Sequence, residues 1–196
     1  ASTQNQALCA LLFLYRKVLE IETPVIAGFE RARRPAHLPT VLSRGEVLVL
    51  LDRLEPPFRL IVELLYGAGL RLGESVALRV KDIDLERHQI TVRRGKGERD
   101  RAALLPSRAR EGLRAQLDAV ARHHRSELAA GRGEVDLPYA LRTKMPSAAT
   151  SLGWPYLFPA SRPCDDPATG RLVLHHLHET AVQKAVRAAA EAAGIA

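Results

Sequence analysis

Apolar side chains recur every three or four positions over long stretches of the chain, which is the spacing of helices with one buried face. In residues 4–20 they stand at i, i+3, i+4, i+7 and i+11 and predict a first amphipathic helix: Leu8, Leu11, Leu12, Tyr15 and Leu19. Ser43, with Glu46 three positions later, forms a capping-box pattern that predicts the start of a second helix. The same spacing, bounded by Pro and Gly, predicts further helices over 58–66, 73–79, 107–124 and about 175–193.

Two short stretches, 89–94 and 101–105, flank the Gly-rich segment Gly95-Lys96-Gly97-Glu98. This pattern predicts a β-hairpin. The region 131–174 is rich in Gly and Pro and is predicted to be a long loop region, which in a compact domain is often functional. The expected fold class is therefore mainly α with a small antiparallel β-sheet near 83–105.

A segment punctuated by Pro and rich in basic residues, 22–42, separates the first helix from the rest and predicts a linker. We therefore expect residues 1–21 to be the last helix of a preceding domain. The chain begins Ala-Ser-Thr without an initiator Met, so its N-terminus is expected to be a cut end. Cys9 lies in the apolar helical stretch and is predicted to be a buried thiol.

Charge changes the picture more than composition does. The chain has 196 residues with 29 Lys and Arg against 22 Asp and Glu, a formal charge of +7, which favours a polyanionic partner such as nucleic acid. No apolar run approaches the ~20 residues of a membrane helix, and the first ten residues carry no signal-peptide pattern. Two cysteines cannot form a disulfide scaffold, so we expect a cytoplasmic protein. Because no apolar run is long enough to span a membrane, we expect no membrane partner.

Two segments contain residues suited to phosphate chemistry. Arg71 follows the helix-ending run Gly67-Ala68-Gly69, and its guanidinium fork suits two oxygens of one phosphate, with Glu74 in position to orient it. Lys96, at the predicted hairpin tip, can reach a phosphate or donate a proton. The alternatives are a surface Arg beside a helix break and an ordinary charged turn. The two glycines are no dinucleotide fingerprint, because no strand precedes them.

Together, LLYGAGLR-x-GE and a hairpin lysine about 25 residues later resemble the first half of a tyrosine recombinase active site. The run LPYALRTKMPSAATSLGWPYLFPASR and the following His175-His176 resemble the insertion, here about 122–176, of integron integrases. The resemblance implies that 1–21 is the last helix of a core-binding domain and 43–196 a partial catalytic domain. It also implies that Arg71 holds the scissile phosphate and that Lys96 protonates the leaving 5′ oxygen.

The resemblance further implies that the insertion grips bases protruding from a folded single-stranded DNA site. Its matching residues are Lys144, Trp154, Pro167, His175 and His176. A flipped-out base needs an aromatic face and short polar contacts, which these residues supply. The alternatives are a local apolar cluster of Trp154 with its neighbours that pins the insertion, and a solvent-facing helix turn at the histidines.

The family's remaining catalytic residues, a His-x-x-Arg box and the tyrosine nucleophile, have no match in this chain, and we expect a C-terminally truncated catalytic domain. Its four tyrosines lie upstream of that region: Tyr15, Tyr66, Tyr139 and Tyr156. The implied parent function is site-specific DNA recombination of gene cassettes by a tetramer, with no metal and no other cofactor. The alternatives are a non-catalytic DNA-binding module and a basic helical interaction domain.

Overall fold

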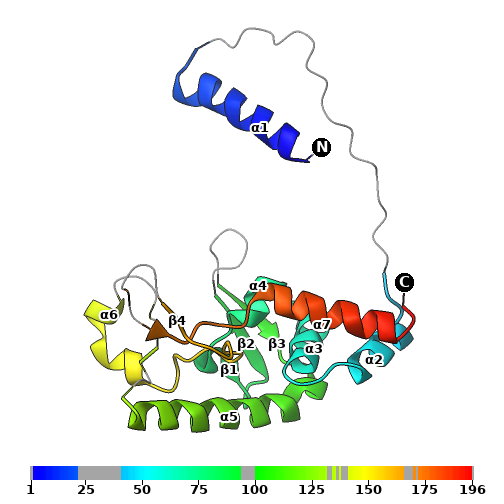
Figure 1. Cartoon of the computed structure of the whole chain (residues 1–196), viewed down its shortest axis with the longest axis vertical. Helices are drawn as coiled ribbons and strands as arrows, with labels where there is room; N and C mark the ends of the chain where they lie inside the picture. Colours follow the sequence, from blue (N-terminus) through cyan, green and yellow to red (C-terminus); the bar gives the residue numbers. More distant parts are fainter. Residues whose placement is uncertain are drawn as a thin grey trace. The chain divides into compact units, whose positions relative to one another are not determined.

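The computed structural model describes residues 2–21, 41–93, 100–131, 134–135, 137, 141–165, 170 and 172–195. The chain divides into two compact units, Ala1–Val41 and Leu42–Ala196 (Figure 1). The segments 22–40 and 94–99 lie outside the described residues, so most of the predicted linker and the predicted hairpin turn do too.

The first unit contains α1 (Ser2–Phe13), which continues into a π-helical turn, η1 (Leu14–Val18). This confirms the helix predicted over 4–20. The described part of the unit is a single helical segment, so its large apolar side chains remain on the surface: Phe13 is 62% exposed and Val18 is 59% exposed. Cys9 is also exposed, and the prediction of a buried thiol is wrong for the same reason.

The second unit is mainly helical, and its helices follow the predicted apolar pattern. They are α2 (Arg44–Asp52), α3 (Phe58–Ala68), α4 (Leu72–Val76), α5 (Arg110–Ala129), α6 (Leu141–Lys144) and α7 (Glu179–Ala192). Short 3-10 turns lie between them: η2 (Val80–Asp82), η3 (Ser107–Ala109) and η4 (Pro146–Thr150). The predicted capping box is present, because the Glu46 N–H donates to Ser43 Oγ and the Ser43 N–H donates to Glu46 Oε2.

Two small antiparallel sheets complete this unit. The first has the order β1-β2-β3, formed by β1 (Ile83–Asp84), β2 (Gln89–Val92) and β3 (Arg101–Leu104). The second pairs β4 (Cys164–Asp165) with β5 (Leu172–Val173) inside the predicted loop region. The expected fold class, mainly α with a small antiparallel sheet near 83–105, is confirmed.

The main core joins α3, the first sheet, α5 and α7. Among its most deeply buried members are Ile61, Leu64, Val76, Ile90, Leu113, Leu157, Phe158 and Val182. A second cluster packs α2 against α3 and α7. In Figure 1, α5 (green) runs along one side of the unit and α7 (orange to red) along the other. A helix from the middle of the sequence and one near its end thus flank the segments between them.

Several helix ends differ from the predictions. α4 stops at Val76 because the chain becomes extended and Leu78 O accepts a hydrogen bond from the Leu157 N–H. α7 starts at Glu179, with His178 as its N-cap, because His175 and Leu177 pair with the segment 158–160. α5 continues to Ala129. The ends of α4 and α7 depend on contacts between distant segments, which local apolar spacing does not record.

Candidate nucleic-acid interface

Arg71 is placed by the way α3 ends. Gly69 adopts a left-handed φ of 63°, which ends the helix and needs glycine. Gly67 lies so close to Pro106 that a Cβ on it would be 2.5 Å from the proline Cγ. The chain then turns, and Arg71 becomes the N-cap residue of α4 with its side chain 58% exposed. An arginine is thereby presented to solvent on a rigid corner.

Glu74 holds Arg71 as predicted. The Arg71 backbone N–H donates to Glu74 Oε2 at 2.8 Å, and Nη1 donates to Oε1 at 2.7 Å. Arg101, on β3, reaches the same carboxylate, with Nη2 at 2.6 Å from Oε2. Two guanidinium groups therefore share one carboxylate and leave a net positive charge beside it, an arrangement that suits an anion such as phosphate.

The environment of Glu74 keeps its carboxylate charged. Its side chain is only 9% exposed, and burial by itself would raise its pKa. The hydrogen bonds from Arg71 and the charges of Arg101 and Arg71 outweigh burial and hold the pKa below its ordinary value. Arg101 was missed by sequence reasoning, although its position at the start of a predicted hairpin strand, after the basic turn, was a usable signal.

The strands β2 and β3 end at the Val92–Arg101 pair. Arg93, the next residue, donates from Nε to Asp82 Oδ1 at 2.7 Å and lies 3.6 Å from Asp100. Lys96 lies outside the described residues. The structure therefore fixes the base of the hairpin, at the end of the sheet where Arg101 contacts Glu74, and leaves the position of Lys96 as a prediction.

Trp154 is half-buried and is held by an extended segment that pairs with residues 78–81. Its backbone O accepts a hydrogen bond from Arg79 Nη1 at 2.6 Å. Its ring packs against an apolar cluster that includes Val135 and Ala148, and Lys81 Nζ lies 2.9 Å from the ring centroid. The alternative of a local cluster of Trp154 with Tyr156, Leu157 and Phe158 is therefore right about an apolar cluster but not about its members, because Leu157 and Phe158 belong to the main core instead.

Tyr156 connects this tryptophan to the two histidines. Arg79 lies with Cζ 4.2 Å from the Tyr156 ring centroid and donates from Nη2 to the phenol oxygen at 3.0 Å. The Tyr156 ring centroid is 5.2 Å from that of His175 and 5.1 Å from that of His176. Trp154, His175 and His176 are thus joined through Arg79 and Tyr156, two residues that sequence analysis assigned no role in the site.

The two histidines stand on a short extended segment rather than in a helix turn. His176 bridges to Pro159, and its Nδ1 donates to the Leu177 carbonyl at 2.9 Å. The imidazoles lie 4.1 Å apart, centroid to centroid, and both are half-buried. The alternative in which they face solvent from a helix turn is therefore wrong, because α7 begins after them.

A cleft of about 630 Å³ joins the two groups of residues. Glu74, Arg93 and Asp100 line one part of it, and Lys81, Trp154 and Tyr156 line another. Lys144 is exposed at the end of α6 and is not among the residues that line this cleft. Pro167 lies outside the described residues. Of the predicted site, the structure therefore brings together the carboxylate that holds Arg71 and the indole of Trp154.

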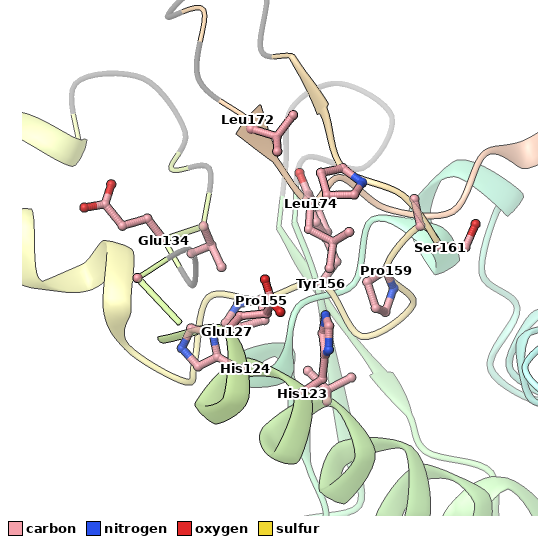
Figure 2. Close-up of a pocket in the computed structure, with 15 residues that line it drawn as sticks. His123, His124, Glu127, Glu134, Pro155, Tyr156, Pro159, Ser161, Leu172 and Leu174 are labelled. Carbon is pink, nitrogen blue, oxygen red and sulfur yellow. The ribbon is translucent and has the colours of Figure 1, made fainter. Parts of the chain in front are cut away.

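A second cavity, of about 720 Å³, lies between α5 and the segments 155–163 and 172–174 (Figure 2). His123, His124 and Glu127 line it from α5, while Leu172 and Leu174 line it from the opposite side in Figure 2. His124 is buried and donates from Nε2 to the Thr150 carbonyl at 3.0 Å, which ties α5 to η4. Tyr156 lines both cavities and separates them.

Lys81 has the most perturbed amine among the described residues. Burial, together with the nearby charges of Arg93 and Arg79, lowers its pKa to about 8, and Asp82 only partly opposes this. Within the described part of the chain, no three acidic, histidine or cysteine residues gather as a metal site, and no helix is long and apolar enough to cross a membrane.

Known proteins resemble this chain in sequence and in fold. Residues 41–196 match the phage integrase family. The chain is 42% identical, over 194 residues, to an integrase/recombinase of Escherichia coli and equally to one of Pseudomonas aeruginosa. These matches include 99% of this chain and 58% of each relative, so the chain spans little more than half of their length. It is also 46% identical over 88 residues to the tyrosine recombinase XerA of Thermococcus kodakarensis, covering 43% of this chain and 31% of that protein.

Solved structures share the fold. The crystal structure of XerA recombinase aligns over 100% of this chain and 56% of its own, with a TM-score of 0.51 and 24% identity. The XerH site-specific recombinase bound to its difH substrate aligns over 96% of this chain and 47% of its own, with a TM-score of 0.53 and 19% identity. At this level of identity the likeness shows the fold alone.

Proposed function

The chain belongs to the phage integrase family of tyrosine recombinases, and we propose that its second unit binds DNA and holds the phosphate at which strands are exchanged. One observation supports this most strongly. The carboxylate of Glu74, which lines the same cleft as Trp154, accepts hydrogen bonds from the guanidinium groups of both Arg71 and Arg101.

In this proposal Arg71 binds the non-bridging oxygens of the scissile phosphate and stabilises the charge that grows on them in the transition state. Glu74 limits the rotation of Arg71, so little entropy is lost when the phosphate binds. Arg101 adds a second positive charge from the other side of the carboxylate. Lys96, on the hairpin that starts beside Arg101, would donate a proton to the 5′ oxygen that leaves when a tyrosine hydroxyl, for which this chain has no match, attacks the phosphorus and forms a 3′-phosphotyrosyl bond. No step of this scheme draws on a metal or nucleotide.

The finer proposal is that the insertion serves a recombinase of integron type, which exchanges gene cassettes at folded single-stranded sites. Trp154 and Tyr156 line one cleft, and the Tyr156 ring contacts the rings of both histidines, so this region offers the ring surfaces that unpaired bases need. Lys144 and Pro167 complete the proposed contacts. We propose that the longer protein works as a homotetramer on DNA in the bacterial cytoplasm, and that residues 1–21 belong to a core-binding domain.

A non-catalytic DNA-binding module is the second candidate. Tyr156, the tyrosine that lines the cleft, has its hydroxyl bound by Arg79 and its ring packed against both histidines. It is therefore not placed as a free nucleophile. Under this alternative the chain binds DNA but forms no covalent adduct with a nicked substrate.

The test compares a DNA hairpin carrying protruding bases with a fully paired duplex of equal length. Stacking on one aromatic side chain contributes ~1–3 kcal/mol per base. At ~1.4 kcal/mol per decade, the hairpin should therefore bind roughly five- to a hundred-fold more tightly. Trp154→Ala should remove most of this preference and leave duplex affinity nearly unchanged, Trp154→Phe should retain part of it, and His176→Ala should reduce it less.

The competing role for Trp154 is an anchor for the apolar cluster around Ala148. In that case Trp154→Ala would weaken hairpin and duplex binding equally and lower the melting temperature strongly, as loss of a large core side chain does. Measuring both affinities and the melting temperature on the same variant separates the two roles, and an equal loss on both ligands contradicts the proposed base contact.

A further inference from the structure

Lys81 lies where the chain pairs with the tryptophan segment. Its backbone N–H donates to the Gly153 carbonyl at 3.0 Å, and a Cβ on Gly153 would lie 3.4 Å from the Lys81 Cβ. This close approach sends the lysine side chain over the next residue, Trp154. The sequence gives no reason to connect the two residues, because 72 positions separate them.

The ammonium occupies one face of the indole. Lys81 Nζ lies 2.9 Å from the centroid of the Trp154 ring, closer than Arg79 Cζ at 5.5 Å. Lys81 and Trp154 both line the cleft that contains Glu74. An aromatic base stacked on this face would fill the volume that the ammonium fills, so the two cannot be there together.

The rest of Trp154 is fixed. Its ring packs against the apolar cluster of Val135, Leu137, Ala148 and Ala149, and its carbonyl is bound by Arg79. The lysine side chain is the flexible member of the pair, since four rotatable bonds carry its ammonium and only its backbone is held. Exchange of a ligand at this ring is therefore expected to move Lys81 rather than Trp154.

Building on the proposed function, we propose that Lys81 is a placeholder on Trp154: it covers the indole face in the free protein, and an unpaired base must displace it to stack there. The lysine thereby sets the threshold for base binding, because each stacked base has to replace a cation–π contact. A base that stacks weakly does not displace the ammonium from the indole. The paired bases of a duplex present no face to the ring.

The surroundings of the ammonium favour its release. Burial and the charges of Arg93 and Arg79 lower the Lys81 pKa to about 8, against the opposing effect of Asp82. The charged form of the Lys81 amine is thus less stable in the cleft than in water. Moving the ammonium out of the cleft toward DNA phosphates restores its hydration and gives it an anionic neighbour, which offsets part of the lost ring contact.

The experiment measures the ratio of hairpin affinity to duplex affinity. Loss of one positive charge weakens binding of both DNAs by a similar factor, so this effect cancels in the ratio. Lys81→Ala removes the competing cation and should raise this ratio about five-fold, the size expected of a partly exposed cation–π contact. Lys81→Arg places a larger cation on the ring and should lower the ratio. Lys184→Ala, an exposed lysine on α7, is the matched control and should leave the ratio unchanged.

The outcomes separate this inference from the proposed function. If wild type prefers the hairpin, and Trp154→Ala abolishes that preference, the base contact stands. The placeholder role is then overturned if Lys81→Ala leaves the ratio unchanged or lowers it, the latter showing that Lys81 only positions the ring. If wild type shows no preference for protruding bases, the base contact fails and the placeholder role fails with it. Melting temperatures of the Ala and Arg variants confirm that each is folded.

Discussion

Glu74 is the residue on which the proposed phosphate site depends, because its carboxylate orients one arginine at the N-cap of α4 and one on β3. Among the described residues, Glu74 is the carboxylate with which both guanidinium groups form ion pairs. The arrangement is part local and part long-range. The Arg71–Glu74 contact follows from a spacing of three residues and is visible in the sequence, whereas Arg101 reaches Glu74 only through the fold of the sheet.

Replacing Glu74 by Gln should lower the free energy of unfolding at pH 7 by about 1–2 kcal/mol, less than for a fully buried pair because both arginines are partly exposed. The pKa of Glu74 is lowered from 4.5 in the folded protein, so its carboxylate stabilises the fold above that pH. This contribution is lost as the pH falls through the folded pKa. The difference between wild type and Glu74→Gln should therefore shrink in acid.

Denaturant unfolding at a series of pH values measures this difference. Glu191→Gln, an exposed glutamate on α7, is the matched control and should cost little at any pH. A stability difference for Glu74→Gln that stays constant from pH 7 to strong acid would mean that the carboxylate charge does not hold the two arginines.

Lys81 should be visible through Trp154, the only tryptophan in the chain. The Lys81 pKa of about 8 means that its amine loses its charge as the pH rises through that value, and the cation–π contact is lost with it. We expect tryptophan emission to change with a midpoint near pH 8. Arg79, Asp82 and Arg93 set the charge around the amine, and Glu74 and Asp100 line the same cleft.

Lys81→Met keeps the length of the side chain and removes the titrating group, so the pH-dependent change should disappear in this variant. An identical midpoint and amplitude in wild type and Lys81→Met would assign the change to another group and remove the support that the shifted pKa lends to the placeholder role.

At the scale of elements, the sequence predicts what local spacing determines. The start of α2 is explained by Ser43 and Glu46 alone, and the end of α3 by its glycines. The end of α4 and the start of α7 could not be predicted, because both are set by pairing of residues 78 and 175–177 with the 157–160 segment. The same holds for the aromatic part of the site. Its residues can be identified in the sequence, but the pairing between distant segments that brings them together cannot.

The corner that presents Arg71 should be intolerant of added volume. Gly67→Ala places a methyl group 2.5 Å from Pro106 Cγ, so α3 and η3 would have to separate, at a cost of about 1–3 kcal/mol. Gly45→Ala in α2 is the matched control. Its nearest neighbour, Ser43 Oγ, is 4.0 Å from the added Cβ, so the better helix propensity of Ala should raise stability by up to about 1 kcal/mol.

Thermal unfolding of the two variants should therefore shift in opposite directions. Equal shifts of the same sign would show that the contact between Gly67 and Pro106 does not constrain the corner. Because Arg71 stands four residues after Gly67, we also expect Gly67→Ala to weaken DNA binding more than its effect on stability alone accounts for.

At the scale of the molecule, the formal charge of +7 predicts that the sequence-independent part of the proposed DNA binding is mainly electrostatic. Affinity should fall with salt at a log–log slope of about −0.9 per phosphate contacted. Arg71→Ala should reduce the magnitude of that slope by about one contact if Arg71 binds a phosphate. Arg187→Ala, which removes the same charge from an exposed position on α7, should reduce it less. Equal slopes for the two variants would place Arg71 outside the phosphate contacts.

The central claim is that one cleft holds both a phosphate, through the arginines on Glu74, and an unpaired base, on Trp154. The most direct measurement is a tryptophan fluorescence titration with the protruding-base hairpin and with the paired duplex, compared at equal fractions of bound protein. Because Trp154 is the sole tryptophan, stacking should quench its emission with the hairpin and leave it nearly unchanged with the duplex. Equal quenching by both ligands, or hairpin binding with no quenching, would contradict the account.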